Sequence, residues 1–226
     1  MEKPVIDRTP IVDKIYKDLR HRIIRAELLP NTKLGVRELC EYYGVSDTPI
    51  KQALNRLVSD GLVETIAHCG MRVRRITEAD IREASEARLM IERFSVPYAI
   101  EAAKYTDVCE RLRRCIEENE VLIDAVLSGD DSNALEELRT SQEFHKIIVD
   151  CTKNKLISDT YEKTLNCQYV YYQQNVGKAA ELKKSLNEHI RILAALEAGN
   201  APEMAEAICE HLKSRECAAL FAALGN

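Results

Sequence analysis

A short stretch in the first third of the chain, residues 36–61, limits the possible folds most. Its first part, Val36–Tyr43, has helical apolar spacing and ends at Gly44, which is suited to the left-handed exit of a helix. Ser46 can then cap a second helix, and Asp47 favours the positive end of that helix dipole. Two short helices joined by such a turn predict a helix-turn-helix.

The flanking residues predict a winged form of this motif. Before it, apolar residues at steps of four predict a helix that follows Thr9-Pro10 and runs to about Ala26. After it, two extended runs, 62–66 and 71–75, enclose a turn that contains glycine, which is the pattern of a β-hairpin. Three helices and a hairpin predict a winged helix-turn-helix DNA-binding domain over residues 1–76.

The rest of the chain, residues 77–226, shows helical periodicity and no convincing strand. Thr77 begins a capping sequence, and Pro97 is expected to kink the first helix. Short breaks separate six predicted helices, at about 79–104, 108–127, 132–151, 154–175, 179–198 and 202–223. The fold class is therefore mainly α, with an antiparallel all-helical bundle behind the winged domain.

Charge and hydropathy support this division. Residues 1–76 carry 14 Lys and Arg against 10 Asp and Glu, a net charge of +4, whereas the remaining 18 and 27 give −9. A basic head on an acidic body is typical of a nucleic-acid-binding module joined to another domain, although an asymmetry this small can arise by chance. The chain has no apolar run of membrane-spanning length and no signal peptide, so we expect it in the cytoplasm.

The start of the second helix of a helix-turn-helix reaches base edges in the major groove. That position predicts contacts to double-stranded DNA from a group of polar residues: Ser46, Asp47, Thr48, Lys51 and Gln52. Arg37 at the start of the preceding helix suits a phosphate or guanine contact. The alternative is that these side chains form an ordinary solvated face.

The segment "GVRELCEYYGVSDTPIKQALNRLVSDGLVETIAHCGMRV" resembles the winged-helix signature of the GntR family of transcription regulators. The resemblance implies that Arg37, Thr48 and Lys51 contact DNA, together with Gly70 in the wing. Asp47 stands where the family usually has arginine, and Lys51 replaces a second arginine. We therefore expect an operator that differs from the common family sequence.

Three histidines of the predicted bundle, His145, His189 and His211, are separated by 44 and 22 residues. The second spacing suits two side chains at one level of adjacent antiparallel helices. Histidine among apolar neighbours is costly unless it is paired or ligated. The spacing is compatible with a metal site, while a lone helical histidine is more often a satisfied structural residue.

The blocks "EARLMIERFSVPYAIEAA", "SQEFHKIIVDCTKN", "NEHIRILAALEAGN" and "AICEHLKSR" are similar to the C-terminal effector (FCD) domain of the FadR branch of this family. The resemblance implies that His145, His189 and His211 hold a divalent metal ion, such as zinc or nickel. Ser141 occupies the position where many members have an aspartate ligand. Loss of the aspartate ligand lowers the expected metal affinity and favours an anionic ligand or a water at the open coordination position. The alternative is a pocket without metal, in which the histidines contact the effector directly.

The resemblance also implies that Arg88 grips the carboxylate of a small organic acid, for which its forked guanidinium is suited. From spacing alone, Arg88 and Glu92 can equally form a surface ion pair. Tyr169 belongs to a tyrosine-rich stretch and is a candidate effector contact, although aromatic residues at helical spacing are more often core.

These features predict a ligand-responsive transcription regulator and no enzyme. A homodimer would bind a near-palindromic operator, with half-sites about one DNA turn apart, and repression is the commoner mode. A small carboxylate in the bundle would release or re-pose the DNA-binding heads. The alternatives are a metal-responsive sensor and a three-histidine metalloenzyme, but the nearby Glu143 faces away from the histidine on its own helix.

Overall fold

The computed structural model describes residues 10–67, 69–174 and 179–223, and the side chains of residues 131, 169–174, 179–180 and 214–223 also lie outside the description. The chain divides into two compact units, Met1–Ile76 and Thr77–Asn226, which we call the head and the body. The predicted fold class is confirmed, because the described residues form helices and one small two-stranded sheet.

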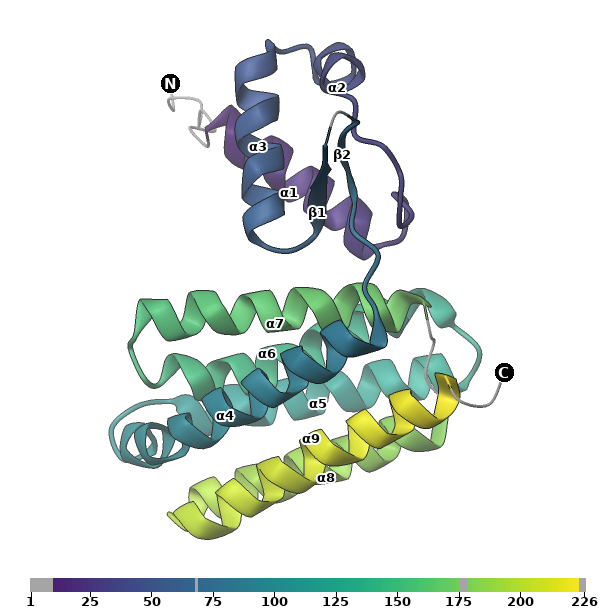
Figure 1. Cartoon of the computed structure of the whole chain (residues 1–226). Coiled ribbons are helices and arrows are strands. Elements are labelled where there is room, and N and C mark those ends of the chain that lie inside the picture. The colour runs from purple at the N-terminus through teal and green to yellow at the C-terminus, as the bar shows by residue number, and fades with distance from the viewer. Residues whose placement is uncertain (1–9, 68, 175–178, 224–226) are drawn as a thin grey trace, which may run out of the picture. The chain divides into compact units, whose positions relative to one another are not determined.

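The head contains three helices, α1 (Ile11–Ile24), α2 (Val36–Tyr43) and α3 (Asp47–Ser59) (Figure 1). Gly44 ends α2 with a φ of 66°, the left-handed conformation that the sequence predicts there. One face of α1 packs against one face of α3. Their buried residues form the core of the head: Ile15, Leu19, Ile23, Ile50, Ala53, Leu54 and Leu57.

The wing consists of two antiparallel strands, β1 (Val63–Ile66) and β2 (Gly70–Val73), paired from Val63 with Val73 to Ile66 with Gly70. The backbone turns into β2 through Gly70, whose φ of 89° strongly favours glycine. Lys33 forms a single β-bridge with Arg72, which joins the loop before α2 to the wing. The head is thus a winged helix-turn-helix.

The body contains six helices within its described residues, connected by short loops. Their bounds are α4 (Glu78–Ala103), α5 (Val108–Leu127), α6 (Ala134–Asp150), α7 (Lys155–Gln174), α8 (Ala179–Glu197) and α9 (Ala201–Ala223). A short 3-10 turn, η1 (Asp131–Asn133), precedes α6. These bounds lie within two residues of the predicted ones.

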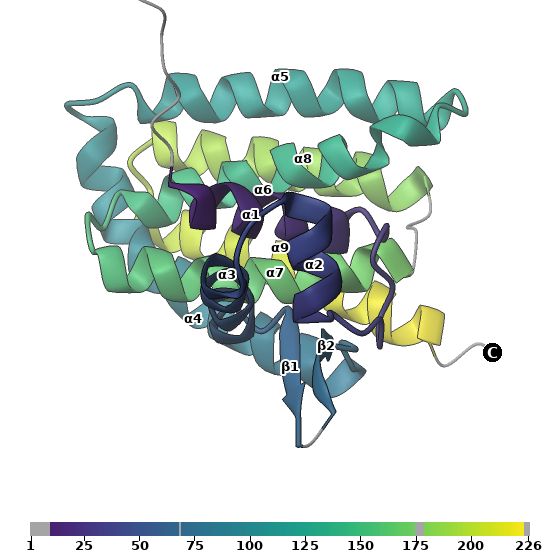
Figure 2. The same cartoon turned by 90° about the horizontal axis from the view of Figure 1, so that it is seen from above.

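Packing in the body places α4 in contact with each of the other five described helices, and α6 in contact with α4, α5 and α7. Figure 2 shows the body helices lying beside one another in a bundle. Apolar residues of α4, α5, α6, α8 and α9 form its core, among them Leu112, Ile148, Ile192, Met204 and Ile208. None of the helices in the described part of the chain combines the length and apolar character that a bilayer crossing requires.

One local detail differs from the sequence expectation. Ser46 occupies the N-cap position of α3 with extended backbone, but its side chain makes no capping hydrogen bond. Pro97 lies inside α4, as predicted, and the helix continues for six residues beyond it. The kink expected at Pro97 stays a prediction. At the start of α4, Thr77 and Asp80 form the reciprocal capping box that the sequence predicts.

Candidate functional site

The face of α3 opposite the core is polar and exposed. The predicted DNA contacts at its start, Ser46, Asp47, Thr48, Lys51 and Gln52, are all exposed. The fully buried Ile50 and Leu54 on the other face hold the helix in place. The head therefore offers a helix whose first turn is free of its own core, as a groove-reading helix requires.

The two positively charged residues among the predicted DNA contacts, Lys51 and Arg37, each form an ion pair within the head. The Lys51 ammonium lies 2.6 Å from a carboxylate oxygen of Asp47, and Arg37 Nε lies 3.3 Å from Glu41. The hydrogen bond from Lys51 lowers the pKa of Asp47, and the same bond raises the pKa of Lys51. Asp47 therefore competes with phosphate oxygens for Lys51, a constraint that arginine at this position would not impose.

In the wing, Gly70 is exposed, and a Cβ built on it would meet no atom within 4 Å. The open space is compatible with close approach of a DNA backbone. Arg72 Nε donates to Glu64 Oε1 across the hairpin at 2.7 Å, so this guanidinium is paired with a carboxylate of the wing itself.

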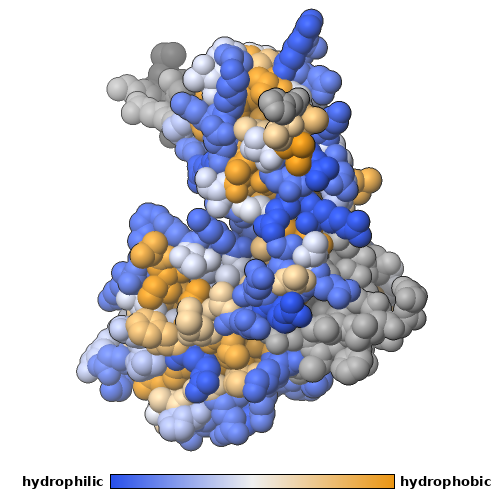
Figure 3. Space-filling model, viewed as in Figure 1, coloured by the Kyte–Doolittle hydropathy of each residue, from blue (hydrophilic) through white to orange (hydrophobic). Residues whose placement is uncertain are grey.

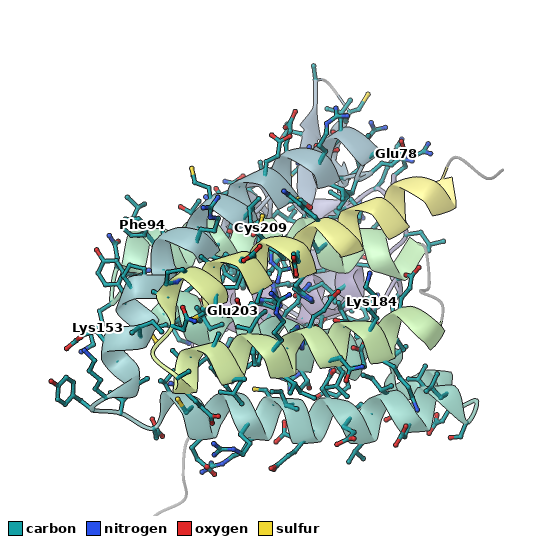
Figure 4. All side chains as sticks on the ribbon, turned by 90° about the horizontal axis from the view of Figure 1, so that it is seen from below. Glu78, Phe94, Lys153, Lys184, Glu203 and Cys209 are labelled. Carbon is teal, nitrogen blue, oxygen red and sulfur yellow. The ribbon has the colours of Figure 1, made fainter. Side chains whose placement is uncertain are left out.

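The three body histidines come together although they lie on three different helices. His145 on α6, His189 on α8 and His211 on α9 are each at most 1% exposed. His145 Nε2 is 3.0 Å from the Nε2 atoms of both His189 and His211. Figure 4 shows α8, which carries Lys184, running beside α9, which carries Glu203 and Cys209.

Carboxylates outside this cluster orient two of the rings. His145 Nδ1 lies 2.8 Å from Glu92 Oε2, and His211 Nδ1 lies 2.8 Å from Glu188 Oε2. A carboxylate accepts a hydrogen bond, so Nδ1–H of His145 and of His211 donates outward and the Nε2 lone pair of each ring points to the centre of the cluster. Phe144 stacks on His189 with ring centroids 4.5 Å apart.

Inward-facing lone pairs repel one another unless a cation lies between them. Zinc–imidazole bonds of about 2.0–2.1 Å would hold three nitrogens about 3.3 Å apart around a tetrahedral ion, close to the spacing here. Three neutral imidazoles with outer carboxylates are a donor set suited to zinc, nickel and similar ions. This buried cluster is a possible metal site.

Ser141, at the position where the resemblance implies an aspartate ligand, is 1% exposed and lies one turn before His145 on α6. Its hydroxyl carries no charge and is a weak ligand for these ions. Three histidines without this carboxylate leave a bound divalent ion with a larger net positive charge.

Arg88 on α4 is buried with Glu92, at 2% and 0% exposure, so the alternative of a surface ion pair is wrong. Arg88 Nε donates to Glu92 Oε1 at 2.6 Å, and the hydroxyl of Tyr161 donates to the same oxygen at 2.7 Å. Burial alone would raise the pKa of Glu92, but the charge of Arg88 and the hydrogen bonds from His145 and Tyr161 act against burial and lower it. Glu92 is therefore ionised and links Arg88 to His145.

The outer end of Arg88 is only partly satisfied. Its Nη1 donates to Gln168 Oε1 at 2.6 Å, whereas its Nη2 is buried and has no hydrogen-bond partner among the described residues. Gln142 Nε2 lies 3.5 Å from the same Gln168 oxygen, and Gln142 Oε1 is likewise buried without a partner in the described part of the chain.

Sequence reasoning missed most of this surrounding polar network. Glu92 was visible only as a helical neighbour of Arg88, and Glu188 only as the residue before His189. Tyr161, Gln142 and Gln168 carry no spacing signal, because helix packing brings them to Arg88. The side chain of Tyr169 lies outside the described residues.

The comparisons with known proteins agree with this architecture. The model of the bacterial regulatory proteins of the gntR family matches residues 11–73, and the FCD domain model matches residues 83–214. The chain is 25% identical over 220 residues to the uncharacterised HTH-type transcriptional regulator YdhC of Bacillus subtilis (strain 168), with 94% of each chain covered. It is 23% identical to the HTH-type transcriptional repressor RspR of Escherichia coli (strain K12), covering 90% of this chain and 86% of RspR.

Among solved structures, a GntR transcriptional regulator from Rhodococcus sp. RHA1 has the same fold, with a TM-score of 0.77 at 21% identity, covering 93% of this chain and 98% of that one. The FCD model alone covers more than half of the chain. Together with the winged head and the buried histidines of the body, these matches show that the chain belongs to the GntR family of DNA-binding transcription regulators, in its FadR-like branch with a C-terminal FCD domain, and not to a class of enzymes.

Proposed function

We propose that this protein is a ligand-responsive repressor whose homodimer binds a near-palindromic operator and is released or re-posed by a small carboxylate. The observation that carries the proposal is a buried arginine, Arg88, whose Nη2 amino group finds no partner among the described residues beside a three-histidine cluster. A structural arginine would be expected to satisfy its donors, whereas a ligand anchor keeps some of them for its ligand. Repression is supported by RspR, a transcriptional repressor similar over most of both chains.

In this proposal the exposed face of α3 reads the operator. Arg37, Thr48 and Lys51 contact DNA together with Ser46, Asp47 and Gln52, and Gly70 lets the wing approach the backbone. Lys51 must exchange Asp47 for a phosphate or a base, because the two are paired in the free head. Action on chromosomal DNA supports a cytoplasmic location.

A divalent ion, zinc or nickel, is the proposed occupant of the histidine cluster. His145, His189 and His211 would hold it, and the extra positive charge left by Ser141 would attract the carboxylate of the effector. The chemistry supplied by the ion is electrostatic attraction and a coordination position for an oxygen ligand. Glu92 and Glu188 keep the two imidazoles turned toward it.

Dimerisation is proposed through the outer face of α4. Met90, Phe94 and Tyr98 form a stripe at steps of four residues, with exposures of 68%, 51% and 43%. Figure 4 places Phe94 at the outer edge of the bundle, and apolar residues gather on the body in Figure 3. The stripe is self-complementary about Phe94, since a two-fold axis there sets Met90 of one copy against Tyr98 of the other, and a near-palindromic operator needs two heads.

The alternative is that the metal ion itself is the effector. The hydrogen-bonded series Arg88–Glu92–His145 favours a site in which the metal ion and the organic acid bind together. The Glu92 carboxylate contacts both Arg88, the proposed anchor of the acid, and His145, a proposed ligand of the ion. An ion bound without a carboxylate would leave Arg88 Nη2 unsatisfied.

Selection of bound duplexes from a random library tests the DNA-binding role, and titration of the resulting complex tests the response. We expect enrichment of a near-palindrome with half-sites about one DNA turn apart, and loss of binding on addition of an organic acid. Loss of binding with the metal ion alone would indicate the sensor. No enrichment over bulk DNA at physiological ionic strength would refute the proposal.

A further inference from the structure

Helix α2, the first helix of the helix-turn-helix, has no fully buried anchor of its own. All eight of its residues are described, and none of them is buried. Just before it begins, the backbone N–H of Leu34 donates to the Met71 carbonyl oxygen of the wing at 2.9 Å. At its end, the Tyr43 hydroxyl donates to Asp18 Oδ2 on α1 at 2.5 Å. These two bonds hold opposite ends of α2 to other parts of the head.

The bond between Tyr43 and Asp18 is of a strong kind, because its acceptor is a carboxylate. Such bonds are shorter and stronger than those between neutral groups. Burial, followed by the hydrogen bond to Asp18, raises the pKa of the Tyr43 phenol. The hydroxyl therefore keeps its proton at neutral pH and is the donor.

The turn that follows Tyr43 is tied to α2 and leads directly into α3 (Figure 1). The backbone N–H groups of Gly44 and Val45 both donate to the Cys40 carbonyl oxygen, so this turn moves with the end of α2. Ser46 then makes no side-chain capping bond, and the first buried residue of α3 is Ile50. The first turn of α3 thus takes its position from the turn before it and from Ile50 after it.

We propose that Tyr43 is a positioning residue for DNA reading: its bond to Asp18 fixes the turn that aims residues 46–48 at the base edges. Without this bond the end of α2 samples further positions, and only a fraction of the heads present the first turn of α3 correctly. The apparent affinity for the operator falls by that fraction. Phosphate contacts with bulk DNA carry no sequence information and tolerate several orientations. The inference rests on the proposed reading role of α3 and adds the residue that orients it.

Two substitutions and their combination test this role in the full-length protein. Tyr43→Phe keeps the ring and removes the donor, and Asp18→Ala removes the acceptor. The affinity for the selected operator is divided by the affinity for bulk duplex, because Asp18→Ala also removes a negative charge and so strengthens binding to every DNA. We expect this ratio to fall about fivefold in each single variant, the change that one partly exposed hydrogen bond gives, and no further in the double variant.

Tyr42→Phe is the matched control, because it removes a tyrosine hydroxyl from the neighbouring position of α2. Tyr42 is 66% exposed, and its ring lies 5.1 Å from the Arg22 guanidinium, a contact that phenylalanine retains. This variant should keep the ratio. Hydrogen exchange should be faster over residues 44–50 in Tyr43→Phe alone, while the buried amides of α1 are unchanged. General damage to the head would speed exchange in both places.

An unchanged ratio in Tyr43→Phe, an equal loss of affinity for operator and bulk duplex, or a double variant that loses the product of the two single effects would overturn the inference. Each of these results would leave the reading role of α3 intact. If the unmodified protein preferred no duplex over bulk DNA, the proposed function would fail, and the positioning role of Tyr43 would fail with it.

Discussion

Asp47 places a negative charge at the start of the helix that is proposed to read DNA. Its carboxylate is exposed and pairs with Lys51. Asp47 therefore repels phosphate, and it also holds the Lys51 ammonium, which would otherwise be free to bind phosphate. A carboxylate can also accept from the amino group of cytosine. One residue thus bears on both the affinity and the base preference of the head.

Asp47→Arg should change the preferred base at one position of each half-site and raise affinity for all duplexes, because it removes a repulsion and frees Lys51. Selection from a random library measures the first effect, and the salt dependence of binding measures the second. Glu27→Arg makes the same charge change at an exposed position outside α3. It should leave base preference unchanged, and an identical preference in the Asp47 variant would contradict the assigned role.

His189→Ala should abolish stoichiometric metal binding, since two imidazoles and a serine hydroxyl make a poor site for zinc or nickel. Elemental analysis of protein purified without chelator and without a polyhistidine tag measures the metal per chain. His21→Ala removes an exposed histidine of the head and should retain the metal. Equal metal in the two variants would show that the cluster is not the site.

Among elements, α1 and α3 are joined by polar bonds as well as by their core. The Tyr16 hydroxyl donates to Asp60 Oδ2 at 2.6 Å just after α3 ends, and Arg56 on α3 pairs with Asp13 on α1. Burial, followed by the hydrogen bond to Asp60 and its charge, raises the pKa of Tyr16 to about 12. The folded head therefore holds this proton more tightly than the unfolded chain, where the phenol titrates near 10.

The sign of the pH effect follows from this difference. Below pH 10 both states are protonated and the contribution of Tyr16 is fully present. Between about pH 10 and 12 the unfolded chain loses the proton first, so the free energy of unfolding falls as pH rises.

Tyr16→Phe should flatten part of this fall, as measured by denaturant unfolding at several pH values and hydrogen exchange of α1 and α3 peptides. Tyr42→Phe, in which the exposed Tyr42 is changed, is the control and should behave as the unmodified protein. The same pH dependence in both variants would contradict the raised pKa of Tyr16.

At the scale of the whole molecule, the proposed near-palindromic operator needs two heads, one for each half-site. The α4 stripe around Phe94 offers the body an apolar surface that a second copy would cover. Burying charge there without a partner is costly, so one acidic residue should separate the copies.

Phe94→Glu should convert the proposed dimer to a monomer, as measured by light scattering after size-exclusion chromatography, and should weaken operator binding. Val121→Glu introduces the same charge at an exposed apolar residue of α5 and should remain dimeric. Monomeric protein before any substitution, or a dimeric Phe94 variant, would argue against the proposed interface.

Helix identities and order could be read from the sequence, because each depends on local signals: apolar periodicity, the capping residues at Thr77 and the glycine at the end of α2. One local prediction failed. Ser46 stands at the N-cap position of α3, but its side chain makes no capping hydrogen bond.

The sequence by itself determined the winged helix-turn-helix, the helical bundle and the residues that can bind a metal ion or an acid. Amphipathic faces and histidine positions are properties of the chain. Only the tertiary structure decided that the three histidines meet and that Arg88 is buried with Glu92. These depend on how α4, α6, α7, α8 and α9 pack, and spacing along one helix carries no information about its rotation against another. Polar groups from different helices are brought together by helix packing, and this packing forms the candidate site.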